Sequence, residues 1–230
     1  MQKKGKGKRE RDLQPLVKSV LGQVSKRYSV LLIRPDLKLR DLGLESTEIL
    51  DLKTKLYRTV AGKDVSQFKQ FADALSINPN STVRQVVDKF AKAPVPSRSV
   101  SLAGDDTTTV KGDDAHIIGT AVRVAVAQAA ACPFAKVGPN LKLSDAPVTF
   151  DSSAIAGLKT GLVQMFSGSE HPTRFKDLST QLQVDPDSTV QQIIDRSVSA
   201  LLPGDGDTHS KGADEAGLPG DDDTKVKGGD

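Results

Sequence analysis

The chain has 230 residues, of which 37% are hydrophobic and 4% aromatic, and its formal net charge is only +3. This length allows one large domain or two small ones. The single cysteine, Cys132, excludes an intrachain disulfide and a cysteine-based zinc site, and the three histidines are too dispersed for metal ligation, so we predict no metal site.

Neither terminus has the composition of a folded core. The first eleven residues carry six basic side chains against one acidic one, and residues 203–230 carry eight acidic side chains against three lysines. We therefore expect a basic disordered tail over 1–11 and an acidic disordered tail over 203–230. No apolar run approaches the roughly 20 residues that span a bilayer, and the N-terminus lacks the apolar stretch of a secretory signal. A cytoplasmic protein without a membrane span is expected.

Helical periodicity dominates residues 12–92. Apolar residues recur at three- and four-residue intervals between Leu13 and Val24 and predict an amphipathic first helix, with residues 30–33 as its end. A second helix is expected from Ser46 and a short third helix around Phe71. After a turn at residues 78–80, Ser81 or Thr82 can cap a last helix. The predicted core positions of the last three helices are Ile49, Leu52, Leu56, Phe68, Phe71, Leu75, Val83, Val86, Val87 and Phe90.

The second half of the chain repeats the first. Residues 37–41 recur at 141–145, residues 45–56 at 151–162, and residues 79–88 at 186–195, so that the spacing drifts only from 104 to 107. This order of matching blocks indicates a duplicated domain. The corresponding helices of the second copy are predicted over 117–132, 152–166, 173–181 and 188–201.

An acidic segment that is rich in Gly and Asp is repeated together with the domain. The segment LAGDDTTTVKGDD occupies 102–114, and LPGDDDTKVKGGD occupies 218–230. Such Asp, Gly and Thr-rich segments bury little apolar surface, so we expect flexible spacers and semi-independent tumbling of the two copies. The expected organisation is a basic tail (1–11), domain 1 (12–92), an acidic linker (93–114), domain 2 (115–202) and an acidic tail (203–230).

The sequence DLGLESTEILDL at 41–52 resembles the D-L-G-x-D-S-L motif that opens the second helix of acyl and peptidyl carrier proteins. The resemblance covers residues 12–92 and, more weakly, 115–202. It implies an all-α fold of two tandem four-helix bundles, with 4′-phosphopantetheine attached covalently to Ser46. It further implies that Asp41, Glu48 and Asp51 contact partner enzymes, which would be a phosphopantetheinyl transferase and acyl-processing enzymes of fatty-acid, polyketide or peptide-type synthesis. In the second copy the attachment residue would be Ser152, with Ser153 a weaker candidate.

The motif departs from the family pattern at several positions. Glu45 stands where the family has Asp, Thr47 where it has Leu or Met, and residues 12–92 contain 14 basic against 9 acidic side chains. Carrier domains are usually acidic, so a basic surface would weaken encounters with basic partners. In the second copy Ala146-Pro147 stands where we align Leu-Gly, and Gly157 lies in the predicted helix, which suggests a close packing contact or a frayed helix start there.

Two functions remain open from the sequence. The first is a carrier, not an enzyme, that presents a phosphopantetheine-bound acyl or peptidyl intermediate. The alternative is an unmodified structural or scaffolding protein, in which Ser46 is an ordinary helix cap. The sequence has no phosphate-binding loop, no nucleophile elbow and no EF-hand spacing. The basic N-terminus is not accompanied by a fold that recognises nucleic-acid bases, so we expect no specific nucleic-acid binding.

Overall fold

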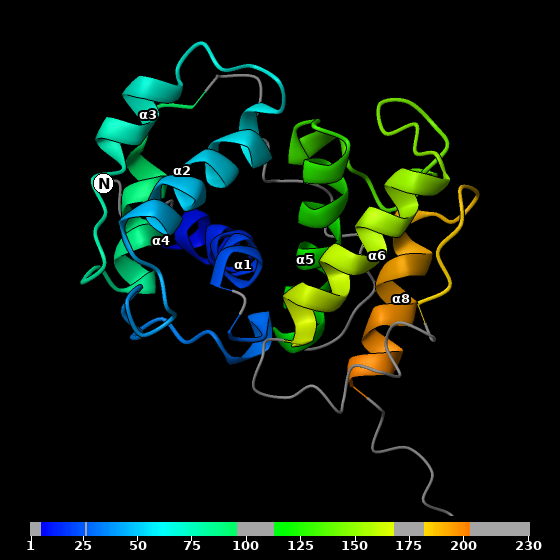
Figure 1. Ribbon diagram of the computed structural model, residues 1–230, viewed down its shortest axis with the longest axis horizontal. Coiled ribbons are helices and arrows are strands. Elements are labelled where there is room, and N and C mark those ends of the chain that lie inside the picture. The colour runs from blue at the N-terminus through cyan, green and yellow to red at the C-terminus, as the bar shows by residue number, and fades with distance from the viewer. Residues whose placement is uncertain (1–5, 26, 96–112, 168–181, 203–230) are drawn as a thin grey trace, which may run out of the picture.

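A computed structural model describes residues 6–25, 27–95, 113–167 and 182–202, with side chains from residue 13 onward. All regular elements in this part of the chain are helical (Figure 1), apart from two isolated bridges. The first copy contains α1 (Lys6–Ser25), η1 (Val30–Leu32), α2 (Ser46–Ala61), α3 (Phe68–Ala74) and α4 (Val83–Lys92). The second contains α5 (Asp113–Ala129), η2 (Phe134–Lys136), α6 (Ser152–Ser167) and α8 (Val190–Leu201). None of the described helices is long and apolar enough to cross a membrane.

The helices of each copy pack around the first helix of that copy. Helix α1 contacts α2 and α4, and α5 contacts α6 and α8 in the same manner. The predicted apolar faces of α2, α3 and α4 are turned into this packing, except that Phe68 is only partly buried. Aromatic contacts join three helices of the first copy, with the Phe71 ring centroid 5.2 Å from that of Tyr57 and 5.9 Å from that of Phe90.

The duplication extends to individual backbone hydrogen bonds. The amide of Leu39 donates to Ser81 O at 3.0 Å, and that of Leu143 donates to Ser188 O at 3.1 Å. In the same register, the segments after η1 and η2 each form an isolated bridge with the residue before the last helix, at Lys38–Thr82 and Lys142–Thr189. The two copies therefore tie the loop before the second helix to the start of the last helix in the same way.

The last helix of each copy begins with the same pair of capping interactions. Thr82 and Thr189 are the N-caps, and the side chain of each accepts a hydrogen bond from the backbone N–H of the glutamine three residues later. Ser81, the other candidate cap, instead accepts from the amide of Asn78 at 3.1 Å, and Ser188 accepts from Asp185 at 3.2 Å. Both serines are buried, so their hydroxyls satisfy turn amides that would otherwise lack a partner.

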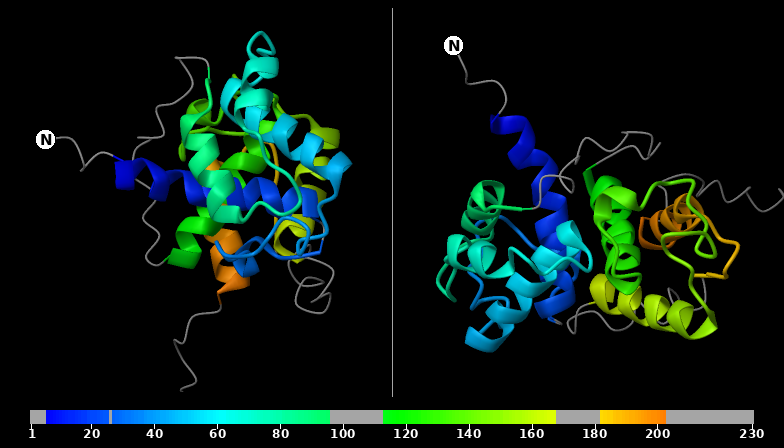
Figure 2. Two further views of the ribbon diagram at one scale, coloured as in Figure 1. Left: turned by 90° about the vertical axis from the view of Figure 1, so that its left-hand side faces the viewer. Right: turned by 90° about the horizontal axis from the view of Figure 1, so that it is seen from above.

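The two copies are joined by direct contact between α1 and α5 (Figure 2), and α1 also contacts α6 while α2 contacts α5. Buried side chains of both copies form one continuous core. Helix α1 is therefore covered on nearly all sides between Leu13 and Ser25, including the polar residues Lys18 and Ser19. Ser19 satisfies its hydroxyl by donating to Pro15 O at 2.7 Å. This shared core contradicts the expectation that the copies tumble semi-independently.

Several expected boundaries differ from those observed. Helix α1 begins at Lys6, so residues 6–11 of the expected tail are helical, and α5 begins at Asp113, inside the expected linker. Residues 30–33 do not end the first helix, because α1 ends at Ser25 and η1 begins separately after its cap, Ser29. The predicted helix over 173–181, the rest of the linker from 96 to 112, and the tail over 203–230 lie outside the described residues.

Candidate functional site

The loop before α2 is held by local hydrogen bonds and by one glycine. Asp41 accepts a hydrogen bond from the amide of Lys38 at 3.1 Å, and the amide of Leu44 donates to Leu39 O at 3.0 Å. Gly43 has a φ of +76°, a conformation that suits glycine because it lacks a Cβ. Leu42 and Leu44 are both fully buried on either side of it. The loop therefore anchors two leucines in the core and turns the chain sharply into the helix.

Ser46 is the first residue of α2, and its side chain is exposed. The N-cap is Glu45, whose amide donates to Glu48 Oε2 at 3.1 Å, so that capping does not use the serine. No group in the described part of the chain hydrogen-bonds to the Ser46 hydroxyl. The interpretation of Ser46 as an ordinary N-cap is therefore wrong.

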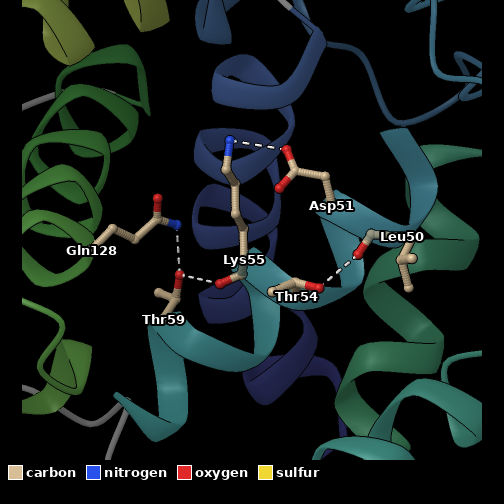
Figure 3. Close-up of polar contacts among 6 residues, drawn as sticks. All are labelled: Leu50, Asp51, Thr54, Lys55, Thr59 and Gln128. Carbon is tan, nitrogen blue, oxygen red and sulfur yellow. Dashed lines mark hydrogen bonds and ion pairs between the residues drawn. The ribbon is translucent and has the colours of Figure 1, made fainter. Parts of the chain in front are cut away.

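The three acidic residues assigned to partner contacts each have an intramolecular partner. Asp41 binds its own loop, as described above. Glu48 also accepts from the Thr47 hydroxyl at 2.9 Å and is only partly exposed. Asp51 forms an ion pair with Lys55, with 3.1 Å between Oδ2 and Nζ (Figure 3). The hydrogen bonds of Asp41 and Glu48 come from neutral donors and leave their charge in place, whereas Lys55 offsets that of Asp51; between Glu48 and Asp51 the helix exposes 59% of Leu50.

The second copy builds the same helix entry with a longer loop. The amide of Phe150 donates to Leu143 O at 2.7 Å, as Leu44 does to Leu39, but two extra residues lie between the ends. Val148 is buried like Leu42, and Thr149 has a φ of +48°, like Gly43. These two residues therefore occupy the Leu-Gly positions, and the alignment of Ala146-Pro147 with Leu-Gly was wrong. The loop, longer by these two residues, is exposed over 144–147.

Ser152 occupies the position in α6 that Ser46 occupies in α2. It is the first helical residue and is exposed, and the preceding Asp151 accepts a hydrogen bond from the amide of Ala154 at 2.8 Å. Ser153 is also exposed but lies one residue into the helix. The core positions after each serine correspond, since Ile49, Leu52 and Leu56 are buried in α2 and Ile155, Leu158 and Leu162 in α6. Helices α2 and α6 therefore share one register relative to their serines.

Gly157 does not make the close contact that its place in a helix suggested. A Cβ built on Gly157 or on Gly161 meets no atom within 4 Å, and both glycines lie well inside α6. The expectation of a packing contact or a frayed start at Gly157 is therefore wrong. Both residues line a hollow at the boundary between the copies, together with Lys55 and Gln128.

Sequence reasoning missed the polar contacts where the copies meet. The Gln128 amide of α5 donates to the Thr59 hydroxyl of α2 at 2.8 Å (Figure 3), and Thr59 in turn donates to Lys55 O at 2.7 Å. Gly62, at the end of α2, lies directly against Pro133 of the second copy. Cys132, next to it, is buried, and this burial raises the pKa of its thiol. No group of three or more potential metal ligands occurs among the described residues.

Comparisons with known proteins add one distant likeness. No family model matches the sequence, and no curated protein matches it. A structural match was found to the solution structure of the apo doublet acyl carrier protein from prodigiosin biosynthesis. The match covers 82% of this chain and 84% of that chain, with 15% sequence identity and a TM-score of 0.26. A TM-score of this size does not establish a common fold.

Proposed function

We propose that the protein is a non-enzymatic carrier whose Ser46 receives 4′-phosphopantetheine and presents an acyl or peptidyl group to partner enzymes. The observation that carries this proposal is the state of the Ser46 hydroxyl, which is exposed at the start of a 16-residue helix and is not used for capping. A transferase can reach such a hydroxyl without disturbing the core.

The residues around Ser46 suit a phosphodiester in this position. The first amides of α2 and the positive end of its dipole favour an anionic group at the helix N-terminus. Gly43 and the two buried leucines beside it fix the loop, so that the serine stays at the helix entry. When bound, phosphopantetheine would supply a thiol on which a partner enzyme can load the cargo. This chain would hold and orient the group and would contribute no acid or base.

Ser152 is the second proposed attachment residue, because its helix entry repeats that of Ser46. We expect Ser46 to be the better substrate. The longer loop adds exposed residues beside Ser152, and the outer face of α6 lacks counterparts of Glu48 and Asp51, where it has Ala154 and Gly157.

The alternative function, an unmodified scaffolding protein, is favoured by one specific observation. Asp41, Glu48 and Asp51 all interact within the chain, and Asp51 is neutralised by Lys55. A partner that reads negative charge on α2 would find that of Asp51 already offset by Lys55, and would have to compete for the hydrogen bonds of Asp41 and Glu48. In this alternative the protein would act through its surfaces alone, and Ser46 would remain unmodified.

Intact-mass measurement separates the two functions. The full chain is incubated with coenzyme A and a broad-specificity phosphopantetheinyl transferase, beside the Ser46→Ala and Ser152→Ala variants. The carrier proposal expects a mass gain of at least one phosphopantetheine, with the gain reduced by one group in Ser46→Ala. An unchanged mass of the wild-type chain would favour the scaffold.

A further inference from the structure

The boundary between the two copies carries a groove, which we call the seam groove. It consists of two adjoining hollows of about 460 and 210 Å³ that share Lys55 and Gln128. The larger hollow is also lined by Arg58, Gly62, Lys63, Val65 and Ala131. The smaller one continues over α6 and is lined by Gln23, Ala125, Ala129, Gly157, Leu158, Gly161 and Gln164.

The larger hollow has the chemistry of an anion-binding surface. Three of its lining residues are cationic and none is acidic, but Lys55 is already paired with Asp51, so the available positive charge is that of Arg58 and Lys63. Among the described residues Arg58 and Lys63 form no ion pair, and both are exposed. The neighbouring Asp64 is engaged in its own loop, where it accepts from the amide of Ser66 at 2.9 Å. Arg58 and Lys63 therefore keep their full attraction for an external carboxylate.

The smaller hollow is lined by two glycines of α6 that the fold itself does not require. Gly157 and Gly161 each cost up to about 1 kcal/mol in a helix relative to alanine, and no neighbour within 4 Å of a built Cβ accounts for either of them. Because glycine has no Cβ, a peptide backbone can pass close to the surface of α6 at these two positions.

From this combination we infer that the acidic C-terminal segment 218–230 of the same chain docks in the seam groove, with Asp221, Asp222 and Asp223 against Arg58 and Lys63. The segment has the complementary charge and carries no bulky aromatic side chain. Nine of its thirteen residues are identical to those at 102–114, although the helical copies have diverged widely.

The chain between the described part and this segment can span a distance comparable to the length of a helix of the fold. Nineteen steps separate Leu202, at the end of the described part, from Asp221, and a flexible chain of that length has a root-mean-square span of about 25 Å and a fully extended length of about 60 Å. For comparison, helix α5 is about 25 Å long, and its C-terminal end borders the groove. Attachment to the same chain raises the local concentration of the segment to the millimolar range, so that weak ion pairs suffice for docking.

Paramagnetic relaxation measured by NMR on the full chain tests the inference. A spin label is placed on Thr224→Cys, and the buried Cys132 with its raised thiol pKa reacts slowly, so that a single label is attached. At low ionic strength we expect loss of most amide signal at Val65, Gly157 and Gly161. The signal should return at about 1 M salt, where the Debye length is roughly 3 Å.

Two charge-matched variants complete the experiment. Substituting Arg58 and Lys63 by glutamine should restore the signals, whereas glutamine at the exposed residues Lys69 and Arg84 should not. Undisturbed seam amides at low salt, or equal disturbance in the seam variant, would overturn the inference. The inference would also be overturned if the label did not broaden the seam amide signals but added inorganic phosphate, or a peptide of residues 102–112, shifted them. The groove would then bind another anion. None of these results depends on whether Ser46 is modified.

Discussion

Gly62 offers a direct perturbation of the contact between the two copies. It ends α2 with a φ of +63° and a ψ of −123°, and a Cβ built on it would lie 2.7 Å from Pro133 Cδ and 3.0 Å from Pro133 N. Backbone strain in such a conformation costs about 1–3 kcal/mol, and overpacking against a rigid neighbour costs a further 1–3 kcal/mol. We therefore expect Gly62→Ala to lower the free energy of unfolding by about 2–6 kcal/mol.

Two other glycines supply matched controls. At Gly43 the nearest atom to a built Cβ is Cδ of the flexible Arg27 side chain, so Gly43→Ala should cost mainly the backbone strain of about 1–2 kcal/mol. At Gly157 a Cβ meets nothing, so Gly157→Ala should stabilise the helix by up to about 1 kcal/mol. Urea denaturation of the three variants gives these free energies.

Hydrogen exchange then shows where the Gly62→Ala destabilisation acts. Because the copies share one core, amides of both α1 and α5 should lose protection. A loss below about 0.5 kcal/mol, the range of an ordinary surface substitution, would refute the contact between Gly62 and Pro133. A loss of protection confined to the first copy would refute the shared core.

Further predictions concern the repeat and the seam. Leu52→Ala and Leu158→Ala should each cost about 2–5 kcal/mol in denaturation experiments, since both side chains are buried in the same register; a near-neutral effect of either would contradict the alignment. Burial lowers the pKa of Lys18, although Asp114 partly opposes this shift. The protonated amine therefore opposes folding below that lowered pKa, and stability should rise as the pH approaches the ordinary value of 10.5. Lys18→Met should accordingly stabilise the protein at pH 7 by on the order of 1 kcal/mol, and an equal gain at pH 7 and pH 10.5 would contradict this explanation.

Much of the local structure follows from the sequence because it depends on local rules. Hydrophobic periodicity predicted the buried faces of α2 and α4, and the repeated blocks predicted that Leu52 and Leu158 hold equivalent positions in the two copies. The choice between Ser81 and Thr82 as a cap could not be made, since either side chain can accept a hydrogen bond from a helix amide. The position of the extra residues in the second loop was equally open, because sequence similarity alone could not separate Ala146-Pro147 from Val148-Thr149 as the counterpart of Leu-Gly.

The contact between the copies was missed, although one signal was present. Helix α5 is rich in valine and alanine on all sides, which is typical of a fully buried helix and not of a surface one. In α1 the polar residues Lys18 and Ser19 concealed the same property, because a serine that donates to the carbonyl four residues earlier can be buried without cost in hydrogen bonds. The seam groove depends on this tertiary contact and could not be predicted without it.

Peptide mapping of the modified chain tests the proposed function most directly. Trypsin releases Ser46 in the peptide 41–53 and Ser152 in the peptide 143–159, so the two serines are read separately in one digest. After incubation with coenzyme A and a broad-specificity transferase, we predict that peptide 41–53 carries phosphopantetheine, located on Ser46 by fragmentation, with lower occupancy on peptide 143–159. Unmodified peptides in a chain whose fold is verified by its NMR spectrum would contradict the carrier function, whereas attachment to Thr47 or Ser153 instead would contradict the assignment of Ser46 and Ser152.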